Sequence, residues 1–168
     1  MAFQILLTTA TLLCSITAGF VFAFATVVMP GLAKLDDGGF IRGFQVIDGI
    51  IQKGQPAFGL VWVGSMITLL IAAVLGFQQL AGTDRWLLIA ATVVYLVGVQ
   101  LPTLTINIPL NNQLQAVNVQ DVEAQAADGA QLAQARASFE PRWNRWNVIR
   151  TVLAIATSLM LLVVILRL

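Results

Sequence analysis

The sequence contains no histidine and only one cysteine, Cys14. Without histidine the chain cannot build a His-ligated haem, a zinc-protease site, a Ser-His-Asp triad or a histidine proton relay. Membrane thiol oxidoreductases need pairs of cysteines, so this class is excluded as well. Any chemistry must therefore come from carboxylates, amides, arginines and aromatic rings.

Charged residues are also scarce. The 168 residues include 9 Lys and Arg and 8 Asp and Glu, a charged fraction of 10%, whereas soluble proteins have about 25%. The net charge of +1 indicates no nucleic-acid partner, because such a partner requires clustered basic residues. A glycine-rich phosphate-binding loop is missing too. Neither nucleic acid nor nucleotide is an expected ligand.

Apolar residues make up 58% of the chain and gather in four runs, approximately 3–29, 58–77, 86–106 and 148–166. About 20 helical residues cross a hydrocarbon core, and in lipid each segment must satisfy its own backbone hydrogen bonds. The sequence therefore predicts an all-α protein, a four-helix transmembrane bundle forming one integral membrane domain over residues 1–168. The only charged side chain in the runs is Arg150, which disfavours an ion-coupled transporter but leaves a facilitator for a neutral solute open.

The distribution of basic residues predicts the orientation. An even number of spans puts both termini on the same side of the membrane. The side opposite the two long loops has only Arg85 and Arg167. The positive-inside rule then places the long loops in the cytoplasm and the termini on the non-cytoplasmic side. We expect a protein of the bacterial inner membrane with the lipid bilayer as its surroundings. The basic residues of the long loops are Lys34, Arg42, Lys53, Arg136, Arg142 and Arg145.

The first long loop carries a helical pattern of its own. Asp36 and Asp37 are residues that favour helix N-caps. Apolar side chains follow at helical spacing, namely Phe40, Phe44, Ile47 and Ile51. This pattern predicts a short amphipathic helix that lies in the interface or over the mouth of the bundle.

Prolines and composition predict where the long helices end. Pro30 lacks an amide donor and is expected to end the first helix, and Pro109 to stop or redirect the chain after the third. Residues 119–137 are rich in Ala and Gln, which predicts a polar helix before the fourth span.

Polar side chains converge on one membrane face from three segments. On a helix, residues spaced three and four apart lie on one stripe. The first loop contributes Gln45 and Asp48, the end of the third span contributes Gln100, Thr103, Asn107 and Asn111, and the start of the fourth contributes Trp143, Trp146, Asn147 and Arg150. A polar end on an apolar bundle is a site where a lipophilic ligand with a few oxygens would bind.

Each of these side chains also has a structural interpretation. Tryptophan and arginine at a membrane boundary commonly act as interfacial anchors. Asn107 and Asn111 flank Pro109 and would serve as turn formers. Asp48 would pair with Arg42 or Arg150. Under this interpretation the polar residues hold the helices together and bind nothing.

The same segments resemble a known family. The strings Asn-Ile-Pro-Leu-Asn at 107–111 and Trp-Asn-Val-Ile-Arg-Thr at 146–151 are similar to motifs of the anthrone-oxygenase-like family of small four-span membrane proteins. Further similar strings are Gly-Phe-Val-Phe-Ala-Phe at 19–24, Val-Met-Pro-Gly-Leu at 28–32 and Gln-Val-Ile-Asp at 45–48. Most members have no established function, and the family name comes from relatives that oxidise anthrones to anthraquinones without metal or flavin.

The resemblance implies a specific chemistry. A base removes an anthrone methylene proton, donors stabilise the enolate oxygen, and molecular oxygen reacts with the carbanion. Asp48 would be the catalytic base, with Asn147 and Arg150 as catalytic oxyanion donors. Trp146 would stack on the rings and Gln45 would orient the substrate. The other expected substrate-binding residues are Asn107, Asn111 and Trp143, and neither a cofactor nor a metal is expected.

Three functional hypotheses remain open from the sequence. The first is a membrane protein that binds a lipophilic aromatic small molecule at the polar end of the bundle, with no reaction assigned. The second is a cofactor-independent monooxygenase acting on an anthrone-like ketone. The third is an accessory or assembly subunit, which would need a membrane-complex partner or a second copy of the chain.

Overall fold

The computed structural model describes residues 1–120 and 129–168, and over these ranges it contains helices and no strands. Four helical segments are long and apolar enough to cross a membrane. They are Ala2–Leu32, Pro56–Gln79, Gly82–Gln115 and Gly129–Leu166. The predicted fold class, an all-α four-helix bundle, is confirmed.

These segments are built from shorter elements. The first consists of α1 (Ala2–Ala23), the π-helical turn η1 (Phe24–Val28) and α2 (Met29–Leu32). The second is α4 (Pro56–Gln79). The third joins α5 (Gly82–Tyr95), the π-helical turns η2 (Leu96–Gln100) and η3 (Thr103–Asn107), and α6 (Ile108–Gln115). The fourth is α8 (Gly129–Leu166), a single helix of 38 residues.

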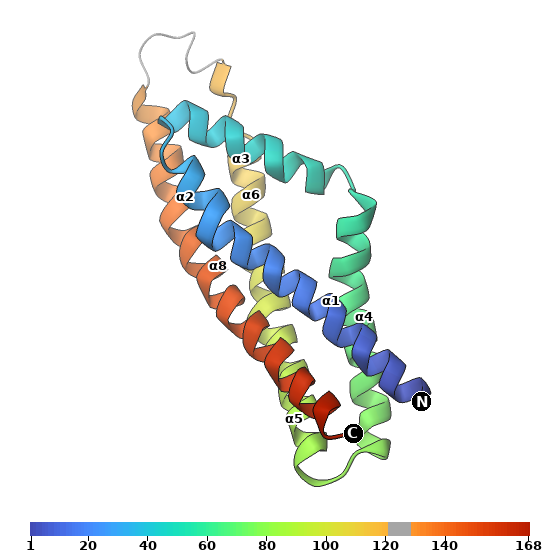
Figure 1. Cartoon of the computed structure of the whole chain (residues 1–168). Coiled ribbons are helices and arrows are strands. Elements are labelled where there is room, and N and C mark those ends of the chain that lie inside the picture. The colour runs from blue at the N-terminus through green and yellow to red at the C-terminus, as the bar shows by residue number, and fades with distance from the viewer. Residues whose placement is uncertain (121–128) are drawn as a thin grey trace.

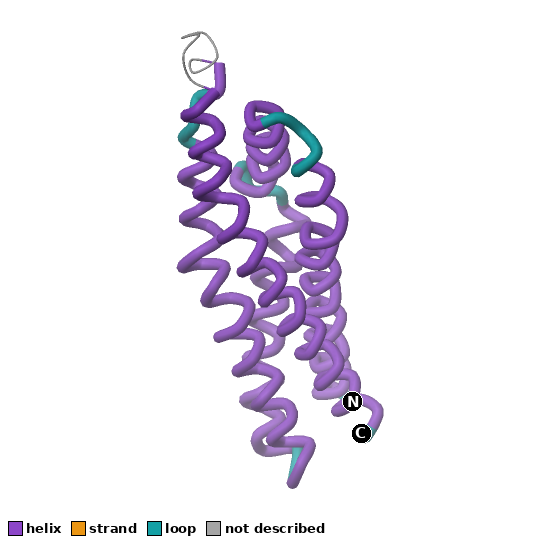
Figure 2. The backbone as a smooth tube through the Cα atoms, turned by 90° about the vertical axis from the view of Figure 1, so that its left-hand side faces the viewer, coloured by secondary structure: helices purple, strands orange, loops and turns teal. Residues whose placement is uncertain are grey.

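The helices pack as a ring. α1 contacts α4 and α8, α8 contacts α5, and α5 contacts α4. The core between them is apolar, with Leu7, Tyr95 and Leu161 fully buried. Both termini lie at one end of the bundle, and α3 (Asp37–Gln52) lies across the other end, as Figures 1 and 2 show.

The outside of the bundle is apolar as well. Leu60 is 71% exposed, Val27 68% and Val74 67%, and many other large apolar side chains share this exposure. In water such an extensive apolar surface would drive association. Its presence on four helices of membrane-spanning length fits a protein whose sides face hydrocarbon.

The predicted helix in the first long loop is confirmed as α3. Asp36 is its N-cap, and the carboxylate of Asp36 accepts a hydrogen bond of 2.8 Å from the Gly39 amide. Phe40 and Phe44 form the inner face of α3 and are almost fully buried. Asp48 follows four residues later on that face, so α3 points a carboxylate toward the end of the bundle.

Two proline predictions were wrong. Pro30 and Pro109 lie inside continuous helical segments and do not end them. In each case the residue before proline donates its amide to the carbonyl five residues back, Met29 to Phe24 and Ile108 to Thr103. This wider π-helical turn moves the backbone that would otherwise clash with the proline ring, so the helix continues.

The helix that carries the fourth apolar run begins well before that run. Residues 148–166 form only the second half of α8, which starts at Gly129. The polar helix predicted over 119–137 contributes the start of α8 from residue 129 onward. Its residues 121–128 lie outside the described residues.

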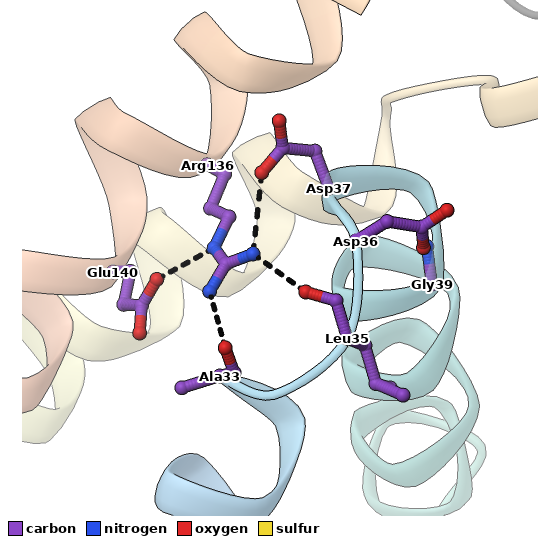
Figure 3. A network of polar contacts seen from close by, with 7 residues as sticks. All are labelled: Ala33, Leu35, Asp36, Asp37, Gly39, Arg136 and Glu140. Carbon is purple, nitrogen blue, oxygen red and sulfur yellow. Dashed lines mark hydrogen bonds and ion pairs between the residues drawn. The ribbon is translucent and has the colours of Figure 1, made fainter.

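Arg136 fixes the start of α8 to the segment between α2 and α3 (Figure 3). Its Nε donates to Glu140 at 2.7 Å, its Nη1 to Asp37 at 3.2 Å and to the Leu35 carbonyl at 3.0 Å, and its Nη2 to the Ala33 carbonyl at 3.1 Å. The guanidinium also lies 4.5 Å from the ring centre of Phe40. We refer to Arg136 and these partners as the Arg136 joint, and it holds α3 in place over the bundle.

Candidate functional site

A cavity of about 290 Å³ lies where α3 meets the ends of the spans. Ligand sites in proteins commonly have volumes of roughly 300–1,000 Å³, so this cavity suits a small ligand. One part of its wall is polar and the other part is apolar. The polar lining residues are Asp48, Gln52, Thr103, Asn107, Asn111, Asn112, Asn147 and Arg150. We call it the polar-end cavity.

Asp48 is held by neutral amides. One carboxylate oxygen accepts from Asn111 Nδ2 at 2.7 Å, and the other accepts from Gln52 Nε2 at 2.7 Å and Gln115 Nε2 at 2.9 Å. Asp48 is only 3% exposed, and these donors compensate the burial of its charge. They occupy three of about four acceptor positions on the carboxylate, which leaves room for one further donor.

Arg150 reaches the same cavity from α8. Its Nη1 donates to Thr103 Oγ1 at 2.8 Å and its Nη2 to Asn147 Oδ1 at 2.9 Å. Asn147 is in turn fixed by its Nδ2, which donates to the Val21 carbonyl at 3.0 Å. Asp48 and Arg150 both line the cavity, but no ion pair joins them. A buried carboxylate and a buried guanidinium therefore line one cavity while remaining separate.

Several buried polar atoms at this end have no hydrogen-bond partner among the described residues. They are Arg150 Nε, both side-chain polar atoms of Asn107, and Gln100 Nε2. Asn107 is 2% exposed and lines the cavity. Leaving a buried polar group unpaired costs about 1–3 kcal/mol. A ligand oxygen that accepts from Arg150 Nε and Asn107 Nδ2 would remove that cost for these two donors, whereas Gln100 is absent from the cavity lining.

A π-helical turn contributes two of the polar side chains that line the cavity. Turn η3 begins at Thr103 and ends at Asn107, and both residues are buried and line the cavity. Turn η2 ends at Gln100, which is also buried. Such turns insert one extra residue per turn and are frequent at functional sites, because they redirect side chains within an otherwise regular helix.

The apolar part of the wall includes three aromatic side chains. Phe20 of α1 and Phe58 and Trp62 of α4 line the cavity. The rings of Phe58 and Trp62 are stacked with centres 5.3 Å apart, and Phe20 lies 5.2 Å from Phe58. A wall of aromatic faces suits a flat ring system.

The structure brings together five of the eight residues predicted for the site. Asp48, Asn107, Asn111, Asn147 and Arg150 all line the polar-end cavity. The other three do not line it. Trp143 contacts a lining residue instead: its Nε1 donates to Asn111 Oδ1 at 2.7 Å and so fixes the Asn111 amide.

Gln45 and Trp146 are the remaining two. Gln45 Nε2 donates to the carbonyls of Leu114 at 2.8 Å and Val117 at 2.9 Å, so Gln45 connects α3 to the end of α6. Trp146 is partly buried on α8 and is absent from the cavity lining. The aromatic side chains in the cavity wall are Phe20, Phe58 and Trp62 instead.

Sequence reasoning missed several cavity residues. Gln52 and Asn112 line the cavity and share a hydrogen bond of 3.2 Å, and Gln115 binds Asp48. The spacing of Asp48 and Gln52, four apart on one helix, was the signal that could have identified Gln52. Within residues 1–120 and 129–168, no group of three or more His, Cys, Asp or Glu side chains is placed to hold a metal ion.

Comparison with protein families identifies a match over most of the chain. A family model described as anthrone oxygenase matches residues 49–160. The matched segment contains Asn107, Asn111, Asn147 and Arg150 and begins one residue after Asp48. No curated protein and no solved structure matches the chain.

Proposed function

Because the chain belongs to the anthrone oxygenase family, we propose that its polar-end cavity binds a flat, lipophilic ring compound through a carbonyl or phenolate oxygen. The ring lies against Phe58 and Trp62, and the oxygen accepts hydrogen bonds from Arg150 and Asn107. The aromatic wall and the polar wall line a single cavity. This arrangement matches a ligand with a ring on one side and an oxygen on the other.

The unpaired donors carry this proposal. Arg150 Nε and Asn107 Nδ2 are buried without a partner among the described residues, and both residues line the cavity. A guanidinium buried away from any carboxylate is expensive to maintain, and the cost falls when it donates to an electron-rich oxygen. A neutral hydrocarbon would leave the cost in place, which favours a ligand that carries an oxygen.

A crystal structure with 2-bromo-9,10-anthraquinone tests the proposal. The expected result is an anomalous bromine peak in the cavity and a quinone oxygen within hydrogen-bond distance of Arg150 Nε and Asn107 Nδ2. A cavity filled only by waters bonded to these two groups would contradict it. The variant Asn107→Leu provides a matched control, since it should lower the occupancy of the ligand.

A second candidate function is the oxidation of an anthrone-like ketone. It is favoured by one observation, that Asp48 and Arg150 line the cavity without pairing with each other. Asp48 would take the methylene proton, and the resulting carbanion would place its charge on the carbonyl oxygen, where Arg150 and Asn107 donate. Molecular oxygen then forms a C–O bond with the carbanion carbon, and the peroxide accepts the proton from Asp48. Loss of the remaining hydrogen on that carbon and cleavage of the O–O bond give the second carbonyl and water.

Oxygen uptake measures this reaction directly. One molecule of anthrone and one of O₂ should give one anthraquinone and one water. The rate with wild-type protein in lipid nanodiscs is compared with the spontaneous rate in empty nanodiscs. Equal rates would eliminate the oxidation while leaving ligand binding to the crystallographic test.

A further inference from the structure

An apolar groove of about 400 Å³ adjoins the polar-end cavity. It lies between α1, α3 and the first turns of α4. Its lining is apolar apart from Thr17 and Gln55. Ile16 and Ile50 line it and are 45% and 58% exposed, so the groove opens on the outside of the bundle. We call it the lateral groove.

The lateral groove and the polar-end cavity lie side by side. Phe20, Ile51, Phe58 and Trp62 line both of them. The aromatic wall on which a ring would stack therefore also borders the groove. The groove opens beside the exposed Ile16 of α1 and Ile50 of α3.

We propose that the natural ligand is an amphiphile, with an oxygenated ring in the polar-end cavity and a hydrocarbon chain in the lateral groove. This inference rests on the proposed function, because the ring site anchors the chain. Hydrocarbon tails of the bilayer are as apolar as the groove, so no hydrophobic driving force selects one chain over another. A chain attached to an anchored ring has the advantage of proximity and of dispersion contacts with a preformed wall.

Ala57 offers a way to close the groove without touching the cavity. It lines the lateral groove and is absent from the lining of the polar-end cavity. The substitution Ala57→Phe should fill the groove near Phe58. Ala90, an exposed alanine on α5, lies outside both linings, so Ala90→Phe is the matched control.

The test compares two probes, 2-methyl-9,10-anthraquinone and 2-hexyl-9,10-anthraquinone. Binding to the protein in lipid nanodiscs is measured and corrected for partition into empty nanodiscs. For the wild type and Ala90→Phe we expect the hexyl compound to bind about tenfold more tightly than the methyl compound. In Ala57→Phe this ratio should fall to about one, while the affinity for the methyl compound is unchanged.

Other outcomes would overturn the inference in distinguishable ways. If both compounds bind the wild type equally, the groove holds no ligand chain, and the proposed ring site stands. If the hexyl advantage survives Ala57→Phe, or disappears also in Ala90→Phe, the chain lies elsewhere. If neither compound binds, the ring site itself is refuted, and the amphiphile with it.

Discussion

Helix α8 carries two buried or partly buried arginines with contrasting surroundings. Arg136 donates through all three nitrogens to Glu140, Asp37 and two backbone carbonyls. Arg150 lies 14 residues further along, is 4% exposed, and donates only to a threonine and an asparagine while its Nε has no partner among the described residues. All three guanidinium nitrogens of Arg136 donate hydrogen bonds, whereas one nitrogen of Arg150 has no acceptor among the described residues.

This contrast separates two roles. The Arg136 joint satisfies its donors with carboxylates and carbonyls of the protein itself, as expected of a group that connects segments (Figure 3). A buried guanidinium without a carboxylate destabilises a fold unless something else accepts its hydrogen bonds. We therefore propose that Arg136 stabilises the fold and that Arg150 serves ligand binding. Four substitutions test these two roles and the site around Arg150.

The largest expected effect belongs to Asp48→Asn. The amide cannot accept the methylene proton, so the rate of anthrone oxidation should fall about 1,000-fold. Oxygen uptake in nanodiscs measures it. Asp37→Asn is the matched control, since Asp37 belongs to the Arg136 joint and lies outside the cavity lining. A full rate in Asp48→Asn would remove Asp48 from the chemistry.

Arg150→Met should have the next largest effect. Loss of the oxyanion donor is expected to lower kcat/KM about 100-fold. The melting temperature should stay within a few degrees of the wild type, because removing a buried charge without a carboxylate partner offsets the loss of its hydrogen bonds to Thr103 and Asn147. Steady-state kinetics and thermal melting of the same preparation provide both values. A large loss of stability with normal kinetics would make Arg150 a structural residue.

Arg136→Met should give the opposite pattern. Removing Arg136 leaves Asp37, Glu140 and two carbonyls without their donor, which should cost about 2 kcal/mol of unfolding free energy. For a chain of this length that is a fall in melting temperature of about 4–8 °C. The kcat/KM of the folded protein should be unchanged. If activity falls and stability does not, the assignment of the two arginines is reversed.

Local sequence patterns predicted much of the fold. The four long helices were predicted from apolar runs of membrane-spanning length. Helix α3 was predicted from the N-cap residue Asp36 and the helical spacing of Phe40 and Phe44. These features depend on neighbouring residues only. The predictions at Pro30 and Pro109 were wrong because a π-helical turn ends at the residue before each proline and lets the helix continue.

The site was predicted less completely because it depends on how helices face each other. Trp143 and Trp146 share a helical stripe with Asn147 and Arg150 but lie outside the cavity lining. Spacing along one helix does not tell which neighbouring helices cover each side chain. Phe58 and Trp62 have the pattern of interfacial anchors, and only the packing of α4 against α1 shows that they form the aromatic wall.

Asn107→Leu tests the central claim most directly, since the two side chains are similar in size and Asn107 has no partner among the described residues. Thermal melting and binding of 2-methyl-9,10-anthraquinone are measured on the same nanodisc preparation. If Asn107 serves to bind a ligand, the variant should unfold with a free energy about 1 kcal/mol higher than the wild type, because a buried amide without a partner is removed. Its affinity for the anthraquinone should fall about tenfold, the loss of one hydrogen bond. A variant that is less stable and binds the anthraquinone as tightly as the wild type would contradict the account.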